Sequence, residues 1–321
     1  MTRAPRSEKV TPISSSHPGF MRADFSGPVY ELIQRELLPH PQYQGLRAGR
    51  ISLAEYGRFL ERSSERSFGT ALTENQRNLV TRFPHSEEVF VDEALKILHD
   101  GGIIPFVEYP KEAFAVFREQ VRATFDHGGY MTFIFPEEER LVFALSHILR
   151  PKRALFLGSY YGYWGIWMLP ALRSGAGHAT FIDPNPQTNA VARMNISALG
   201  FAEYANVLDA EGTHYLNELL AGESFDFLLL DAEGPDDAPD PEYRGKRVYL
   251  PLITTALRSL SPGATVMVHN ILLRGSVRSP YFERLIRKNS EELGAFMDFT
   301  SRHFSRREII DSTEGIGVFK L

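Results

Sequence analysis

Apolar and polar positions recur with two different periods along the chain, and the change of period divides it. Up to about His127, apolar residues return every three or four positions, which is typical of amphipathic helices. The segments with this spacing are YELIQRELL (30–38), LAEYGRFLERSSER (53–66), TENQRNLVTRF (73–83) and KEAFAVFREQVRATF (111–125). We therefore expect an all-α region at residues 19–127, after a mobile tail at residues 1–18 that is rich in Ser, Pro and Arg.

After Gly128 and Gly129 the pattern becomes an alternation of short apolar runs and helical segments. A helix is predicted over PEEERLVFALSHILRP (136–151), with Pro at its start, three acids in its first turn and Pro after its end. The strand-like runs that follow are RALFL (153–157), HATFID (178–183), YANVLD (204–209), FDFLLLD (225–231) and ATVMVHN (264–270). Helix-like segments separate them, an order that indicates a parallel, doubly wound sheet over residues 128–321.

The last part of the chain breaks this alternation. Two strand-like runs, FTSRHFSRREII (299–310) and GIGVFKL (315–321), are joined by residues 311–314. Two such runs in succession predict a hairpin that closes the sheet antiparallel. The expected fold class is therefore α/β with a C-terminal antiparallel hairpin and an all-α N-terminal region.

Composition narrows the classes of function. The 321 residues include 43% hydrophobic and 12% aromatic residues, enough for a large core. The net charge of -5 and the lack of a long basic run argue against a nucleic-acid partner. The chain has no cysteine, which excludes disulfides, thiolate metal sites and cysteine nucleophiles. No apolar run is long enough for a signal peptide or a membrane span, so we expect a cytoplasmic protein without a membrane partner.

The first strand ends in a turn that predicts a nucleotide-binding edge. In RALFLGSYYGYWGIW (153–167), Gly158 and Gly162 lie four apart, which allows a tight turn and a close approach of the backbone to a ligand. The spacing lacks the G-x-G-x-x-G pattern that places a pyrophosphate at a helix N-terminus. We therefore expect a cofactor with an adenosine group but no phosphate.

Acidic residues at the ends of the next two strands fit the same cofactor, because ligands of a doubly wound sheet bind at the carboxyl ends of its strands. Asp183 can accept both hydroxyls of a ribose, or it can cap the helix after Pro184. Asp209 and Glu211 can accept the exocyclic amine of adenine, or they are solvated turn acids.

Three polar residues follow the fourth and fifth strands. Asp231 comes after three leucines, and His269 with Asn270 follows a Val-Met-Val run. Neighbouring strand ends lie side by side, so the three side chains should converge near the cofactor. They form a candidate site for a divalent metal or for proton transfer.

These residues resemble a known family. GSYYGYW (158–164) is similar to the first motif of class I S-adenosylmethionine-dependent methyltransferases, in particular the catechol and caffeoyl-CoA O-methyltransferase group. Further motifs of that group are resembled, in order, by GGYMTFIFPEEERLVFAL (128–145), FIDPNPQTNAVARMNISALGF (181–201), FDFLLLDAE (225–233), LSPGATVMVHNILLRGSV (260–277) and RREIIDSTEGIGVFKL (306–321). The resemblance covers residues 128–321 and implies a Rossmann-like methyltransferase sheet.

The resemblance also assigns roles to individual residues. It implies that S-adenosylmethionine is surrounded by Met131, Gly158, Tyr160, Gly162, Asp183, Glu211 and Asp231. It further implies that Asp231 and Asn270 are two of three ligands of a divalent cation such as Mg²⁺ or Mn²⁺.

The sequence departs from the group at three positions. His269 replaces an Asp that is the third metal ligand, Gly234 replaces a Lys that often acts as base, and Phe156 replaces an acid in the first strand. Two mechanisms therefore stay open: a metal held by Asp231, His269 and Asn270, or a metal-free site in which His269 is the general base.

The resemblance implies O-methylation of a small hydroxylated, aromatic acceptor, for which natural-product biosynthesis is one setting. Tyr160, Tyr161, Tyr163 and Trp164 either line the pocket or belong to the core. C- or N-methylation without metal, a dehydrogenase and a non-catalytic S-adenosylmethionine-binding module are the alternatives. The N-terminal helices must bury their apolar faces, so we expect them to form a lid or a homodimer interface.

Overall fold

The computed structural model describes residues 40–48, 50–51, 55, 87–130, 132–219, 223–274 and 280–321. The strands are β1 (Arg153–Leu157), β2 (His178–Asp183), β3 (Ala205–Asp209), β4 (Phe225–Leu230), β5 (Leu260–Val268), β6 (Arg306–Ile310) and β7 (Ile316–Lys320). The α-helices are α2 (Pro41–Arg47), α5 (Glu87–Asp100), α6 (Lys111–Thr124), α7 (Pro136–Leu149), α8 (Leu169–Gly175), α9 (Pro186–Ala198), α10 (Gly212–Glu218), α11 (Tyr249–Ala256) and α12 (Pro280–His303). Short 3-10 helices are η4 (Gly165–Met168), η5 (Pro241–Tyr243), η6 (Lys246–Val248) and η7 (Leu257–Ser259).

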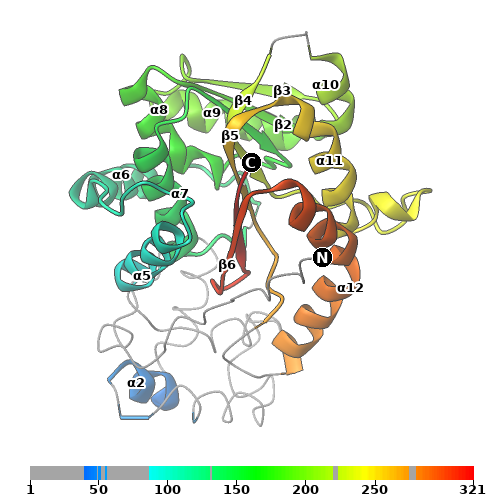
Figure 1. Cartoon of the computed structure of the whole chain (residues 1–321). Coiled ribbons are helices and arrows are strands. Elements are labelled where there is room, and N and C mark those ends of the chain that lie inside the picture. Colours follow the sequence, from blue (N-terminus) through cyan, green and yellow to red (C-terminus); the bar gives the residue numbers. More distant parts are fainter. Residues whose placement is uncertain are drawn as a thin grey trace.

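The strands form one seven-stranded sheet in the order β3-β2-β1-β4-β5-β7-β6 (Figure 1). β1 to β5 run parallel, and β7 pairs antiparallel with both β5 and β6. The chain starts at the central β1, winds outward to β3, and returns to add β4 and β5 on the other side. This order confirms the predicted doubly wound sheet and its closing antiparallel hairpin.

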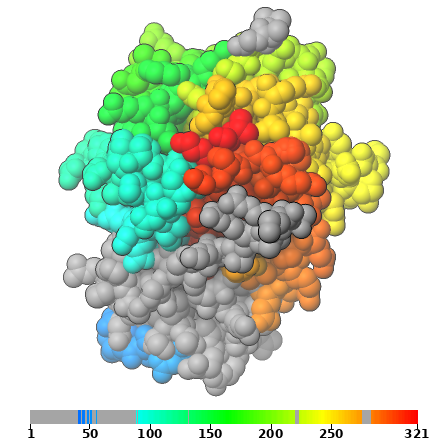
Figure 2. Space-filling model, in the orientation of Figure 1, coloured from blue at the N-terminus to red at the C-terminus, as the bar shows by residue number. Residues whose placement is uncertain are grey.

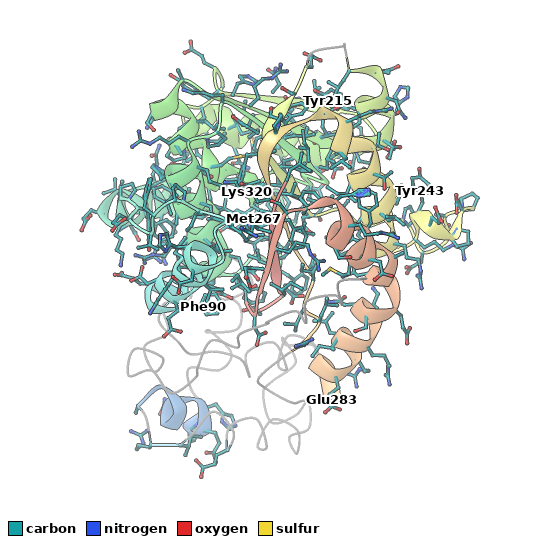
Figure 3. The ribbon with its side chains drawn as sticks, in the orientation of Figure 1. Phe90, Tyr215, Tyr243, Met267, Glu283 and Lys320 are labelled. Atoms are coloured by element: carbon teal, nitrogen blue, oxygen red, sulfur yellow. The ribbon has the colours of Figure 1, made fainter. Side chains whose placement is uncertain are left out.

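Both faces of the sheet are covered, which explains why its central strands are apolar throughout. Successive residues of β1 point to opposite faces, so Phe156 packs into one core and Leu155 and Leu157 into the other. Helices α5 to α9 cover the first face, and α10 to α12 cover the second (Figure 1). Figure 3 shows Met267 of β5 and Lys320 of β7 near the middle of the molecule, between these two layers.

The helix caps agree with the local sequence. Pro136 begins α7 behind Phe135, whose backbone N–H donates to Oε2 of Glu138 at 3.0 Å. Asn185 caps α9 by accepting from the backbone N–H groups of Gln187 and Thr188. These caps fix where each helix begins relative to the strand that precedes it.

The prediction of a strand over residues 299–310 is wrong in its first half. Helix α12 continues to His303, and β6 begins only at Arg306. Leu293, Phe296 and Thr300 are buried and continue the helical spacing of three and four. That periodicity outweighs the strand-like alternation of the segment.

The predicted helix at 111–125 is present as α6, and α5 precedes it. Phe114 and Phe117 of α6 lie within 5.2–6.5 Å of Phe143 of α7, measured between ring centroids. In Figure 2, the cyan surface that includes α5 and α6 borders the green surface of later residues. Both helices therefore share the core of the sheet, although they precede the expected domain boundary at His127.

The predicted helical segments at 30–38 and 73–83, and the one at 53–66 apart from residue 55, lie outside the described residues. Among the described helices, none combines the length and the hydropathy needed to cross a membrane.

Candidate active site

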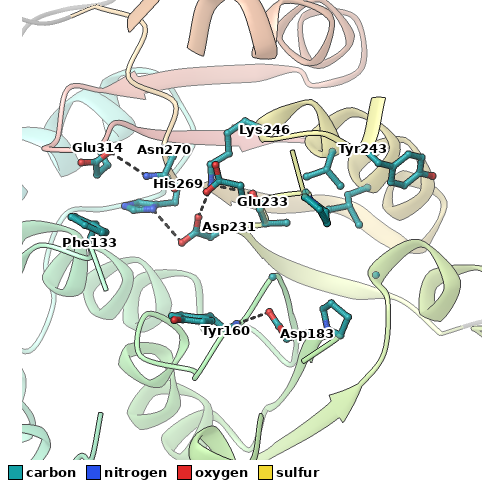
Figure 4. A pocket seen from close by; sticks show the side chains of 18 of the residues that line it. Phe133, Tyr160, Asp183, Asp231, Glu233, Tyr243, Lys246, His269, Asn270 and Glu314 are labelled. Carbon is teal, nitrogen blue, oxygen red and sulfur yellow. Dashed lines mark hydrogen bonds and ion pairs between the residues drawn. The ribbon is translucent and has the colours of Figure 1, made fainter. Parts of the chain in front are cut away.

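A cavity of about 650 Å³ opens at the carboxyl ends of the parallel strands, where a doubly wound sheet binds its ligands (Figure 4). Its volume lies in the range of small-molecule sites, which is roughly 300–1,000 Å³. One side carries Gly158, Tyr160 and Asp183 from the ends of β1 and β2. The opposite side carries Asp231, Lys246 and Asn270. Figure 4 shows the two groups facing each other across the cavity.

The turn after β1 requires glycine at position 158. Gly158 has φ 75°, and a Cβ there would lie 2.4 Å from the carbonyl oxygen of Asp231. Its backbone N–H and that of Ser159 both donate to the carbonyl oxygen of Ile182. Gly162 also has a positive φ and closes the turn by donating to Ser159, but it is not among the residues that line the cavity. Of the predicted cofactor residues, Met131 lies outside the described residues.

Asp183 holds this turn from β2. Its Oδ2 accepts the backbone N–H of Tyr160 at 2.9 Å, and its Oδ1 accepts that of Asn185 at 3.0 Å. Asp183 is therefore not the cap of α9, since Asn185 fills that position. Burial raises the pKa of Asp183 above its ordinary value, against the opposing effect of the two backbone N–H groups. A carboxylate has about four acceptor positions, so both oxygens keep capacity for ligand hydroxyls.

The two acids after β3 have different surroundings. Glu211 lines the cavity and caps α10, because its carboxylate accepts the backbone N–H groups of Thr213 and His214. Asp209 instead pairs with Arg193 at 2.6 Å and does not line the cavity. Glu211 therefore stays a candidate for binding the cofactor, whereas the carboxylate of Asp209 is engaged in an ion pair outside the cavity.

Of the four aromatic residues after Gly158, one lines the cavity and three do not. Tyr161, Tyr163 and Trp164 are at most 5% exposed and belong to the core. Tyr160 is 42% exposed and lines the cavity, with φ 49°. A positive φ in a bulky residue is uncommon and shows that the turn dictates where this ring lies.

Asp231 and His269 meet as expected for neighbouring strand ends, but a lysine joins them. Oδ2 of Asp231 lies 3.2 Å from Nδ1 of His269, and Oδ1 lies 3.3 Å from Nζ of Lys246. The His269 contact is an ion pair without the alignment of a hydrogen bond. Burial alone would raise the pKa of Asp231, but the cations of His269 and Lys246 outweigh burial and hold that pKa well below its usual range.

His269 lines the cavity, but its side chain is almost completely enclosed. Its Nε2 lies 3.0 Å from Oε2 of Glu138, and its side chain is only 2% exposed. Burial by itself lowers the pKa of His269, but the carboxylates of Glu138 and Asp231 raise it to about 10. The ring is therefore an imidazolium near neutral pH, held between two carboxylates, and has no free lone pair there.

Glu138 belongs to a buried acidic group at the start of α7. Its Oε1 accepts from the hydroxyl of Ser312 at 2.7 Å and from the backbone N–H of Glu314 at 3.1 Å. Glu137 accepts from the hydroxyl and the backbone N–H of Thr313. Burial, together with the charge of Glu138, raises the pKa of Glu137 to about 8. These acids tie α7 to the turn between β6 and β7.

Asn270 completes this side of the cavity. It has φ 54°, and its side-chain amide donates to Oε2 of Glu314 at 3.3 Å. The backbone therefore brings Asp231, His269 and Asn270 together as the sequence predicts.

The donor set does not fit a divalent cation as it is arranged. A metal needs neutral imidazole as a ligand, whereas His269 faces a carboxylate at each nitrogen. Lys246 places a positive charge on the remaining oxygen of Asp231. Within the described ranges, no group of three or more His, Asp or Glu side chains is arranged to hold a metal ion.

Sequence reasoning missed Glu138 and Lys246. The three acids of α7 read as an ordinary helix start, because acids are common in the first turn. Lys246 follows Asp231 by fifteen positions through an irregular segment, which gives no periodic signal.

Comparison with known proteins supports the motifs. Residues 155–271 match a family model described as a methyltransferase domain. A catechol O-methyltransferase of Niastella koreensis is 28% identical over 147 residues, which are 45% of this chain and 60% of that protein. The chain spans about 60% of the length of the curated relatives it matches.

Two solved structures of methyltransferases are among those to which this chain is similar. An O-methyltransferase from Bacillus cereus, in complex with S-adenosylhomocysteine, has 17% identity and a TM-score of 0.42, covering 74% of this chain and 100% of its own. An S-adenosylhomocysteine-bound methyltransferase from Podospora anserina has 16% identity and a TM-score of 0.48, covering 74% and 97%.

The strand order, the cavity at the strand ends and the family match agree on the class of the matched residues. Residues 155–271 form a methyltransferase domain. The resemblance of the motifs to class I S-adenosylmethionine-dependent methyltransferases, and to the catechol O-methyltransferase group, is confirmed.

Proposed function

We propose that the protein is an S-adenosylmethionine-dependent O-methyltransferase that acts in the cytoplasm on a small hydroxylated, aromatic acceptor. The observation that carries this proposal is the cavity at the strand ends of a methyltransferase domain, with a glycine turn and Asp183 on one side and a cationic, polar group on the other. The relatives named as O-methyltransferases support oxygen as the accepting atom.

The donor would bind on the side of β1 to β3. Gly158 lets the backbone approach the ligand, Asp183 would accept the ribose hydroxyls, and Glu211 would accept the adenine amine. Tyr160 lines the same side and offers its partly exposed ring as a wall. Among the described residues that line this half of the cavity there is no lysine or arginine, which suits a donor without phosphate groups.

The acceptor would bind between the aromatic side chains and the ends of β4 and β5. Phe133 is 41% exposed and lines the cavity together with Tyr243. Rings of this kind bind an aromatic molecule through edge or stacked contacts. Lys246 and Asn270 supply the polar end of this half, where the hydroxyl of the acceptor would lie.

S-adenosylmethionine supplies an activated methyl group on a sulfonium. The task of the chain is then to hold the acceptor oxygen in line with that methyl and to favour its anionic form. Exclusion of water and fixed charges in the cavity strengthen such positioning. This task needs no metal-dependent step, and the arrangement of His269 and Lys246 does not fit a cation.

Donor binding is tested by calorimetry with S-adenosylhomocysteine. We expect wild-type protein to bind it, and Asp183→Ala to weaken binding by roughly 10- to 100-fold, as for the loss of hydrogen bonds to a charged group. The matched control is Asp298→Ala, an exposed aspartate of α12 that does not line the cavity. Absence of binding in the wild type, or equal weakening in both variants, would remove the proposal.

Methyl transfer is tested with S-adenosylmethionine carrying a labelled methyl group and a panel of catechols and other phenols. The position of the label in the product, read by mass spectrometry and NMR, decides between oxygen and the carbon or nitrogen alternatives. Transfer to carbon or nitrogen only would contradict O-methylation while leaving the donor site intact.

We also propose that the protein is a homodimer in which residues before α5 form a lid or an interface. The support is the amphipathic spacing of the segments at 30–38, 53–66 and 73–83, whose apolar faces need a partner surface.

A further inference from the structure

The cavity contains a buried cation at the place where the fourth strand ends. Nζ of Lys246 lies 3.3 Å from Oδ1 of Asp231 and donates to the carbonyl oxygen of Ala232 at 3.0 Å. The side chain of Lys246 is only 8% exposed, yet Lys246 lines the cavity. Figure 4 shows it beside Asp231 and Asn270, on the side opposite Tyr160 and Asp183.

The segment after Asp231 is built to deliver this lysine. Gly234 and Gly245 exchange two backbone hydrogen bonds, 3.0 and 3.1 Å long, which fold the intervening residues into a closed loop. The backbone N–H of Lys246 then donates to Oε2 of Glu292 on α12 at 2.8 Å. The loop and α12 therefore fix where the side chain of Lys246 begins.

The same loop excludes a lysine at position 234. A Cβ on Gly234 would lie 1.7 Å from the carbonyl oxygen of Tyr243, so no side chain fits there. The pairing of Gly234 with Gly245 therefore excludes a cationic side chain at position 234. It places one instead at Lys246, the residue that follows Gly245.

An ammonium group has three N–H donors. Within the described part of the chain, two of those of Lys246 are directed to Asp231 and Ala232, and Nζ also lies 5.1 Å from the centroid of the Tyr249 ring. The third N–H has no hydrogen-bond acceptor among the described residues and can serve a ligand in the cavity. His269 cannot compete for this role, because its nitrogens face Glu138 and Asp231. Lys246 is thus a buried cation of this wall with a donor to spare, whereas Lys288, which also lines the cavity, is half exposed and pairs with Glu233.

We propose that the ammonium group of Lys246 binds the oxygen of the methyl acceptor, in place of the divalent cation that the resemblance of the motifs implies. The inference rests on the proposed function and names the group that holds its reacting oxygen. Asp231 and Ala232 orient the ammonium, and His269 with Glu138 orients Asp231. Glu138 and His269 are positioning residues, which act on the acceptor through Asp231.

The transfer step balances without a metal. The acceptor hydroxyl releases its proton to solvent, and its oxygen becomes an anion beside Nζ of Lys246. A lone pair of that oxygen forms the new bond to the methyl carbon. The bond from that carbon to the sulfonium sulfur breaks, and its electron pair stays on sulfur, which gives S-adenosylhomocysteine. The ammonium stays protonated throughout and stabilises the anion that forms.

The absence of cysteine from the chain allows a direct test by chemical rescue. In Lys246→Cys the only thiol is at position 246, and 2-bromoethylamine converts it to a side chain that ends in an ammonium at nearly the lysine length. We expect Lys246→Cys to lower kcat by roughly 10²–10³-fold, the usual loss for one donor to a reacting oxyanion. Aminoethylation, verified by mass spectrometry, should restore most of the rate.

Alkylation with iodoacetamide adds a neutral group of similar size and should restore nothing. Lys96→Cys, at an exposed position of α5, is the control and should keep its rate before and after both treatments. A Lys246→Cys rate equal to the wild-type rate, or equal rescue by the charged and the neutral group, would overturn the proposal.

A second arm measures metal binding without activity. Calorimetry with MnCl₂ on protein saturated with S-adenosylhomocysteine should show no stoichiometric binding. Stoichiometric Mn²⁺ binding that Asp231→Asn abolishes would also overturn the proposal.

The proposed function and the proposed role of Lys246 are contradicted by different results. Wild-type protein that binds no S-adenosylhomocysteine contradicts the proposed function itself. Wild-type protein that binds it and methylates a phenol, with Lys246→Cys equally active, contradicts only the role of Lys246.

Discussion

Gly158 is the residue on which the donor side of the cavity depends. Its φ of 75° is unfavourable for any other residue, and a Cβ would lie 2.4–2.7 Å from backbone atoms of Asp231 and Ala232. We expect Gly158→Ala to lower the free energy of unfolding by about 2–5 kcal/mol, the sum of left-handed strain and overpacking. It should also weaken binding of S-adenosylhomocysteine, as read by calorimetry beside denaturant unfolding.

Gly294 of α12 is the matched control for this substitution. It lies in a helix and is exposed, and a Cβ added there would meet no atom within 4 Å. Gly294→Ala should therefore raise stability by about 0.5–1 kcal/mol, the ordinary helix preference for alanine. If Gly158→Ala were as harmless as Gly294→Ala, the close approach of β1 to the end of β4 would be wrong.

The sequence predicts which residues lie at the site better than it predicts their contacts and charges. Asp183, Asp231 and Asn270 follow strands at a shared sheet edge, so their convergence is predictable from strand order. The state of His269 is set by Glu138, which is 131 positions away in the chain. No spacing rule connects residues that meet only after the helix α7 has packed against β5.

The link between α7 and β5 is a buried ion pair, and it makes stability depend on pH. The folded-state pKa of His269 is raised to about 10 from an ordinary value of 6.5. Its stabilising contribution is therefore complete below pH 6.5 and is lost as the pH rises through 10. Glu137, with a pKa raised to about 8, weakens the fold between pH 4.5 and 8 and has no further effect above that. Above pH 8 a further fall in stability therefore reports on His269 rather than on Glu137, until the buried tyrosines begin to contribute near pH 10.

We expect the free energy of unfolding of the wild type, measured with denaturant, to fall between pH 8 and 10. In Glu138→Gln only Asp231 faces the imidazolium, so the loss should move to lower pH and the fall in this interval should shrink. The amide oxygen keeps an acceptor for Ser312 and Glu314, while the amide nitrogen replaces the acceptor of the Phe135 backbone N–H. Parallel pH curves for the two proteins would show that the pair does not carry this dependence.

Elements were predictable where a single period dominates. The strand at 178–183 is predicted and found with the same bounds, because a short apolar run there is bounded by Gly177 and Pro184. The segment at 299–303 was misassigned to a strand, because five residues are too few to distinguish the helical period from the alternation of a strand. Packing decides for the helix, since Leu293 and Phe296 extend its buried face.

At the scale of the molecule, α5 and α6 belong energetically with the sheet. Seven large apolar side chains of these helices are buried in its core: Phe90, Val91, Leu95, Leu98, Phe114, Phe117 and Val121. At about 2 kcal/mol for each side chain, their burial contributes on the order of 10 kcal/mol. That is comparable to the whole net stability of a typical domain, which is about 5–15 kcal/mol.

Two truncations therefore have opposite expected outcomes. A chain of residues 87–321 should be soluble and bind S-adenosylhomocysteine, whereas a chain of residues 128–321 should lose that core and fail to fold. Circular dichroism measures folding, calorimetry measures binding of S-adenosylhomocysteine, and sedimentation velocity measures the oligomeric state. If residues before α5 form the homodimer interface, the full chain should sediment as a dimer and the 87–321 chain as a monomer. A soluble 128–321 chain with wild-type donor affinity would show that α5 and α6 are dispensable for the fold. A dimeric 87–321 chain would move the interface to the part of the molecule that contains the sheet.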